Sequence, residues 1–101
     1  METASVHRIV VVQNRQGLHM RPADLLVRTA ARFQSRIEIE KDGQAVDCKS
    51  ILGILTLAAG PGAELTLRAA GSDAAEALDC LAELFAQKFN EADSEVSTPG
   101  Q

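Results

Sequence analysis

Strict alternation of apolar and polar residues marks two segments of this chain and limits what the chain can fold into. Residues 36–40 read RIEIE, and residues 64–69 read ELTLRA. Because successive side chains of a strand point to opposite faces, each segment predicts a strand with one buried and one wet face. A sheet made of such strands is mostly antiparallel, and its helices cover only one face.

The other apolar segments complete a fold prediction. A β-branched run within residues 8–13 predicts the first strand, and Asp42-Gly43 predicts a hairpin turn before a return strand over residues 45–48. Helical spacing predicts three helices: one from His19 or Met20 to Phe33, one over residues 51–58, and one after Asp73. Asp73 and Glu76 predict a capping box at the start of the last helix. The expected fold is an α+β open-faced two-layer sandwich in the order βαββαβα. Its four-stranded, mostly antiparallel sheet carries three helices on one face.

The length of 101 residues allows one domain. We assign that domain to residues 8–90 and treat residues 1–7 as an N-terminal extension. The polar, acidic tail of residues 91–101 is expected to be disordered.

Charge and composition exclude several classes of function. Ten basic residues against 14 acidic ones give a net charge of −4, and the chain has no Trp or Tyr. Coating or stacking on nucleic acid is therefore not expected. Residues 8–36, however, contain six arginines and one aspartate, which gives a local charge of +5. Such a basic region suits phosphoryl groups and acidic partner surfaces.

Cysteine usage and hydropathy indicate a cytoplasmic protein. Cys48 and Cys80 stand 32 residues apart in apolar patterns, which predicts buried thiols in a reducing compartment. No apolar run reaches about 18 residues, and no signal peptide precedes the domain, so no membrane association is expected. His7 and His19 have no ligand partners at metal spacing, so neither a metal nor a cofactor is expected.

The segment GLHMRPA, residues 17–23, is the strongest candidate for chemistry. A histidine at the start of a helix lies beside backbone N–H groups without intrahelical acceptors, which form an anion site. We expect Gly17, Met20 and Arg21 to form the phosphoryl-binding turn, with His19 as a phosphohistidine. The alternative is a histidine that only caps the helix beside an incidental arginine.

The segment KSILGIL, residues 49–55, is the second candidate. Ser50 is a good N-cap. At 100° per residue, Ile51, Leu52 and Leu55 fall on one arc of the helix, whereas Ile54 and Leu57 fall on another. One arc is then an exposed docking patch. The alternative is a helix buried on both arcs.

Residues 8–90 resemble the HPr family of histidine-containing phosphocarriers of the bacterial phosphoenolpyruvate-dependent phosphotransferase system. The resemblance lies in GLH-x-RPA at residues 17–23 and in KSI-x-G at residues 49–53. It implies that enzyme I phosphorylates His19 at Nδ1 and that His19 passes the group to IIA domains of sugar transporters, while Arg21 steadies the phosphoryl oxygens. The implied protein is a monomeric carrier without turnover of its own. The implied docking patch consists of Leu18, Met20, Ile51, Leu52 and Leu55.

By the same resemblance, Ser50 matches the position that HPr kinase/phosphorylase modifies, and transcriptional regulators are further possible partners. Two departures stand out. Met20 occupies a position where smaller or more polar residues are common, and the tail extends beyond the usual end of the family. Two alternatives remain: a mainly regulatory protein acting through Ser50 or in a nitrogen-related relay, and a small ligand- or metal-binding module.

Overall fold

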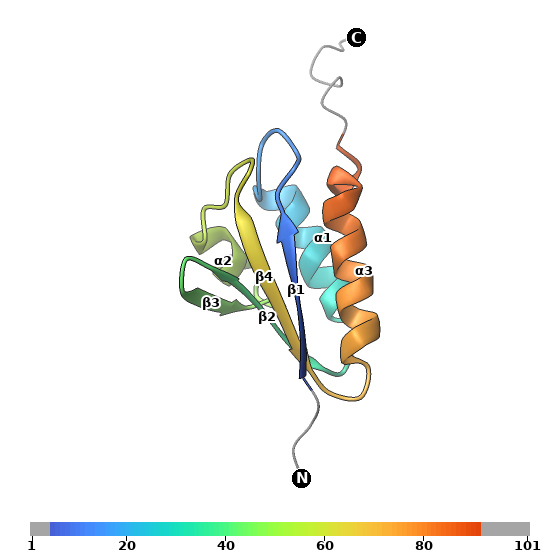
Figure 1. The fold of residues 1–101 in the computed structure, drawn as a ribbon. Coiled ribbons are helices and arrows are strands. Elements are labelled where there is room, and N and C mark those ends of the chain that lie inside the picture. The colour runs from blue at the N-terminus through green and yellow to red at the C-terminus, as the bar shows by residue number, and fades with distance from the viewer. Residues whose placement is uncertain (1–4, 92–101) are drawn as a thin grey trace.

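Four strands form one antiparallel sheet, and the helices lie against one of its faces (Figure 1). The structure is a computed structural model, and it describes residues 5–91. The strands are β1 (Ser5–Val11), β2 (Arg36–Lys41), β3 (Gln44–Asp47) and β4 (Glu64–Ala70), in the sheet order β1-β4-β2-β3. The predicted α+β open-faced sandwich is therefore confirmed.

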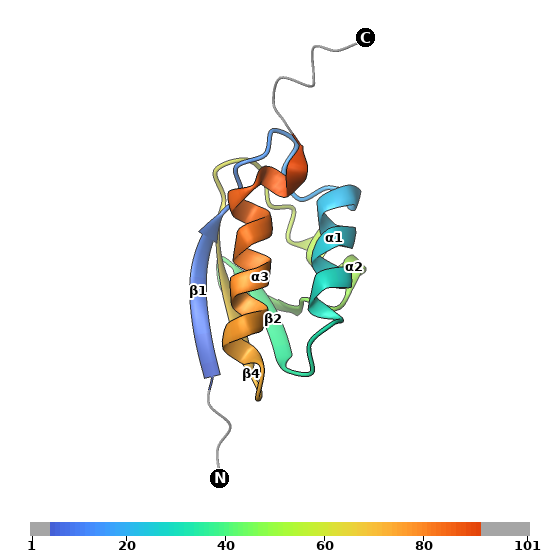
Figure 2. The ribbon, with the colours of Figure 1, turned by 90° about the vertical axis from the view of Figure 1, so that its right-hand side faces the viewer.

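Three α-helices build the second layer: α1 (Met20–Ala30), α2 (Ile51–Thr56) and α3 (Ala74–Ala86), with a short turn η1 (Lys88–Asn90) after α3. In Figure 2, α3 and α1 run side by side over the sheet, and α2 packs next to α1. α1 begins at Met20, as the sequence predicts, and Pro22 falls in its first turn, where a missing N–H is tolerated.

β1 differs from its predicted bounds. It begins at Ser5, three residues before the predicted strand, and it ends at Val11. Ser5 to His7 pair with Ala70 to Arg68 of β4, so the ladder continues beyond the β-branched run. Residues 5–7 therefore belong to the sheet and not to an extension. Residues 1–4 and the predicted tail from residue 92 onward lie outside the described part of the chain.

The alternating segments behave as predicted. Ile37 and Ile39 of β2 are at most 2% exposed, and Leu65, Leu67 and Ala69 of β4 are at most 2% exposed. The residues between them face away from the helices. The hairpin between β2 and β3 uses Asp42 and Gly43 with φ of 50° and 86°, and two successive positive φ angles are what a type I′ turn requires.

The predicted capping box at the start of α3 is wrong. Asp73 occupies the N-cap position, but its side chain makes no capping hydrogen bond. Its carboxylate instead accepts hydrogen bonds from the backbone N–H groups of Gln34 and Ser35, at 2.9 and 3.0 Å, and from the Ser35 hydroxyl. These bonds, led by that of the Ser35 hydroxyl, lower the pKa of Asp73. Asp73 thus joins the start of α3 to the segment between α1 and β2.

A close backbone contact fixes the loop that leads into α1. Gly17 has a φ of +72°, and a Cβ at this position would lie 2.6 Å from the Ala59 carbonyl oxygen and 2.9 Å from Gly60 Cα. The next residue, Leu18, donates its backbone N–H to the same Ala59 oxygen at 2.9 Å. A side chain at residue 17 would therefore be strained in its backbone and would also collide with the neighbouring loop.

Leu18 requires a correction. The resemblance placed it on the docking patch, but its side chain is 5% exposed and belongs to the hydrophobic core. Its backbone N–H is also bonded to the Ala59 carbonyl of the neighbouring loop. Leu18 therefore anchors the loop and offers a partner almost no exposed surface.

The Asp73→Asn variant is expected to melt several degrees below the parent at pH 7, since an amide nitrogen cannot accept these hydrogen bonds. A carboxyl whose pKa is lowered by folding stabilises the fold above its unfolded pKa of about 3.9, and this contribution disappears as the pH falls through the folded value. The difference in Tm should therefore narrow below about pH 4. Thermal melts from pH 2 to 8 measure it, with Asp24→Asn, which loses only an exposed pair with Arg28, as the control. A constant difference across this range would contradict the assignment.

The Gly17→Ala variant is expected to lose about 1–3 kcal/mol of unfolding free energy, from the left-handed φ together with the collision at Ala59. Gly60→Ala is the matched control in the facing loop, because a Cβ there meets nothing within 4 Å and φ is not positive. It should stay within about 1 kcal/mol of the parent. Urea titrations compare them, and equal losses would refute the role given to Gly17.

Candidate functional site

The side chain of His19 is not used to cap α1. His19 is the N-cap residue, with φ −81° and ψ −168°, and its side chain makes no capping hydrogen bond. Its backbone is fully engaged, because its N–H donates to Gly17 O at 3.0 Å and its carbonyl accepts from Ala23 N at 3.1 Å. The interpretation of His19 as a simple helix cap therefore does not hold, and its imidazole is available for other contacts.

The first turn of α1 offers an anion site beside His19. The backbone N–H groups of Met20 and Arg21 have no acceptor among residues 5–91, and Pro22 has no N–H. No acidic residue lies in this turn. Two free donors and the positive end of an 11-residue helix favour a phosphoryl group at this position.

The Arg21 side chain is also available. Arg21 is exposed, and its guanidinium has no hydrogen-bond or ion-pair partner within the described part of the chain. A guanidinium two residues after the histidine can form paired hydrogen bonds with phosphoryl oxygens. The sequence therefore identified three parts of the site that the fold places in one turn: His19, Arg21 and the free N–H groups.

Two further residues of the site were missed in the sequence. Glu91 accepts a hydrogen bond from His19, with Oε2 at 3.0 Å and Oε1 at 3.3 Å from Nε2. The buried Asn14 donates from Nδ2 to Glu91 Oε1 at 3.1 Å and to Gly17 O at 2.8 Å. Glu91 is the first residue of the segment that we expected to be disordered. The only signal in the sequence was Phe89, the last apolar residue in the pattern of α3, which indicates that the chain packs on the core up to that residue.

The predicted apolar patch lies on neighbouring parts of α1 and α2. Leu52 is 72% exposed and Met20 is 58% exposed, whereas Ile51 and Leu55 are half-buried against the core. On the other arc of α2, Ile54 and Leu57 are buried. The alternative in which α2 is buried on both arcs is therefore wrong. From here on, "docking patch" means Met20, Ile51, Leu52 and Leu55.

Ser50 caps α2, as the sequence predicts. Its Oγ accepts a hydrogen bond from Gly53 N at 3.1 Å, and its side chain is half-buried next to the docking patch. Lys49 donates from Nζ to the Phe33 carbonyl at 2.8 Å. This bond joins the start of α2 to the segment that follows α1. A charge added at Ser50 would therefore change the surface on which Leu52 lies.

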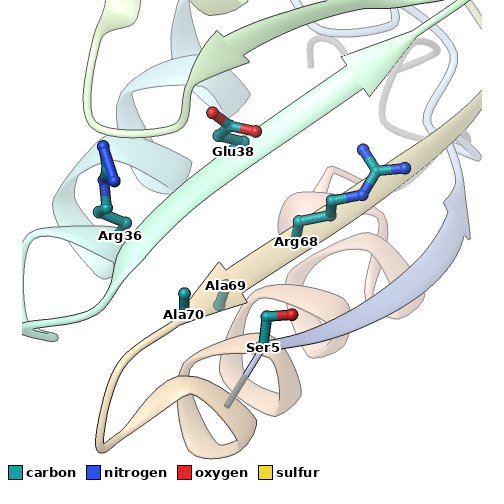
Figure 3. Close-up of a pocket in the computed structure, with 6 residues that line it drawn as sticks. All are labelled: Ser5, Arg36, Glu38, Arg68, Ala69 and Ala70. Carbon is teal, nitrogen blue, oxygen red and sulfur yellow. The ribbon is translucent and has the colours of Figure 1, made fainter. Parts of the chain in front are cut away.

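Other features offer less for chemistry. A hollow of about 230 Å³ on the open face of the sheet is lined by Arg36, Glu38 and Arg68 among others (Figure 3). It mixes charges of both signs, and Arg68 is already paired with Glu40. It also lies at the end of the sheet opposite to the start of α1 (Figure 1). Burial raises the pKa of Cys48 to about 12, so its thiol is not a ready nucleophile.

Metal and membrane features can be stated for the described residues. Within residues 5–91 no group of three or more His, Cys, Asp or Glu side chains is placed to hold a metal ion. In the same range, no helix has both the length and the apolar character needed to span a membrane.

Comparison with known proteins agrees with this geometry. The family model described as the PTS HPr component phosphorylation site matches residues 6–87. The phosphocarrier protein HPr of Treponema pallidum is 45% identical over 86 residues, which cover 85% of this chain and 98% of that protein.

Solved structures extend the comparison. The crystal structure of HPr from Bacillus anthracis is 49% identical, with a TM-score of 0.78, over 81% of this chain and 98% of that one. Crh, a catabolite-repression protein of Bacillus subtilis described as a swapped, intertwined dimer, is 46% identical, with a TM-score of 0.67, over 78% of this chain and 91% of that one. With its fold, its histidine turn and these matches, the chain belongs to the HPr family of phosphocarrier proteins of the phosphotransferase system, which carry a phosphoryl group and are not independent catalysts.

Proposed function

We propose that this chain accepts a phosphoryl group on His19 Nδ1 from phospho-enzyme I and passes it to IIA domains of sugar transporters in the cytoplasm. The observation that carries this proposal is an imidazole left free of capping at the start of α1, in the same turn as two free N–H groups and the unpaired Arg21. Membership of the HPr family agrees with it.

The transfer needs no acid–base group of its own. The Nδ1 lone pair attacks phosphorus, the bond from phosphorus to the donor breaks, and the donor keeps that electron pair. The backbone N–H groups of Met20 and Arg21 then donate to phosphoryl oxygens, and the Arg21 guanidinium donates to the same group. Transfer to a IIA domain reverses these steps with a new acceptor.

We further propose that enzyme I and IIA domains dock on the docking patch. Leu52 and Met20 are large, exposed apolar side chains. They lie beside the first turn of α1, which contains Arg21 and no acidic residue. A partner with an apolar centre and an acidic rim fits this surface. We propose a monomer, since the patch must stay open, and a swapped dimer such as that described for Crh is the alternative.

Ser50 is our candidate for regulation by an HPr kinase/phosphorylase. A phosphate there adds about −1.5 to −2 charges next to the docking patch, and we expect it to weaken docking of acidic partners. The likeness to Crh favours a second candidate function, in which the protein acts mainly through phospho-Ser50 on transcriptional regulators. A nitrogen-related relay would use the same histidine with different partners.

Labelling separates the carrier from the regulator. With labelled phosphoenolpyruvate and enzyme I, the parent should take up acid-labile label, and His19→Ala should take up none. His7→Ala, which changes the other histidine, is the control and should label like the parent. Absence of label from the parent would overturn the carrier proposal.

The same preparation tests regulation. With ATP and an HPr kinase, acid-stable label should appear on the parent and be absent from Ser50→Ala. Parent protein that carries phospho-Ser50 should then accept label on His19 at least several-fold more slowly. An unchanged rate would show that Ser50 does not control docking.

The docking patch is tested by Leu52→Ala, which should weaken binding to enzyme I by about tenfold with little change in Tm, because the side chain is 72% exposed. Ile9→Ala is the matched control, since Ile9 is 58% exposed on the open face of the sheet. Titration calorimetry gives both affinities. If both substitutions changed the affinity for enzyme I equally, enzyme I would not dock on the docking patch.

A further inference from the structure

A left-handed turn after α3 brings the chain back to His19 and the first turn of α1. Lys88, Phe89 and Asn90 have φ of 55°, 55° and 62°, a conformation that residues with a Cβ rarely adopt. Phe89 is fully buried, and its ring meets the Phe85 ring edge-on at 4.8 Å between centroids. Packing of Phe89 therefore holds this turn, and Glu91 follows it.

Glu91 is placed on one atom of the histidine. Its carboxylate contacts His19 Nε2 at 3.0 Å, and the Glu91 side chain is only 15% exposed. The Asn14 amide holds the other carboxylate oxygen at 3.1 Å. Because the second Asn14 Nδ2 hydrogen goes to Gly17 O, the amide is oriented by two acceptors, even though its Oδ1 is buried without a partner among the described residues.

This contact determines which ring nitrogen carries the proton. A carboxylate only accepts hydrogen bonds, so Nε2 must be the donor and carry hydrogen. In the neutral ring the lone pair is then on Nδ1. When Nδ1 takes a phosphoryl group and Nε2 keeps its proton, the ring becomes cationic, and the Glu91 carboxylate already faces that charge.

We infer that Glu91, held by Asn14, is a positioning residue that keeps His19 as its Nε2–H tautomer and balances the charge of the phosphorylated ring. This inference rests on the proposed phosphoryl transfer at His19. The family model ends at residue 87, four residues before Glu91, so the assignment comes from the geometry of this chain.

The test uses Glu91→Ala and Glu91→Gln in the full chain. Long-range ¹H–¹⁵N spectra of the His19 ring report the tautomer, and phosphoryl uptake from phospho-enzyme I is timed. For Glu91→Ala we expect a mixture of tautomers and uptake slowed by about tenfold, the order expected for loss of a charge-assisted hydrogen bond. Glu91→Gln, which keeps an acceptor without the charge, should fall between Glu91→Ala and the parent. Melting curves check that both variants fold.

Glu76→Ala is the control for loss of one negative charge, since Glu76 is exposed on α3. It should keep the parent tautomer and rate. An unchanged tautomer ratio or an unchanged uptake rate in Glu91→Ala would overturn the inference, while acid-labile label on His19 would leave the carrier proposal intact. Absence of such label from the parent itself would instead overturn the carrier proposal.

Discussion

The contact between two loops at Gly17 and Ala59 is the constraint on which the site depends. It joins the segment before α1 to the segment between α2 and β4, through a backbone approach that only glycine tolerates and through the hydrogen bond from Leu18 to Ala59. The same two segments are bonded again between Val12 and the Gly62–Ala63 pair, at 2.7 and 2.9 Å. The start of α1 is therefore held relative to α2, and His19 and the docking patch keep a common position.

A fold with few reactive side chains suits a protein that only carries a phosphoryl group between partners. The α1 turn supplies donors for a phosphoryl group, and the sheet and α3 supply the core that keeps this turn in place. His19 is 34% exposed and Arg21 is exposed, so a phosphoryl group carried on the imidazole, as proposed, would stay accessible. The proposed partners would then reach this imidazole directly from solvent.

Most of the fold could be predicted because its signals are local. Alternation along β2 and β4 marks buried faces, and Asp42-Gly43 marks a turn, so each can be read from a few adjacent residues. The start of β1 and the partner of Asp73 could not be read in this way. Ser5 lies in a strand because it pairs with Ala70, and the carboxylate of the N-cap residue Asp73 accepts hydrogen bonds from Ser35, 38 residues away, and none from its own helix. Both outcomes depend on contacts that form only in the assembled fold.

In the candidate site, too, the residues joined by local spacing could be predicted, whereas those joined by contacts in the assembled fold could not. His19 and Arg21 lie in one turn of helix, so their spacing was enough to join them. Leu18 lies next to them, yet its side chain is buried in the core and its backbone N–H is bonded to Ala59. Glu91 is 72 residues from His19, and it reaches the ring through three successive left-handed residues, a conformation that Lys88 and Phe89 rarely adopt.

The central claim is that phosphorus binds Nδ1 of His19 because Nε2 keeps its proton. The most direct measurement is ¹⁵N and ³¹P NMR of the phosphorylated, ¹⁵N-labelled protein, which shows which ring nitrogen is coupled to phosphorus and which retains hydrogen. The account predicts coupling of ³¹P to Nδ1 and a retained hydrogen on Nε2. Coupling of ³¹P to Nε2 would contradict it.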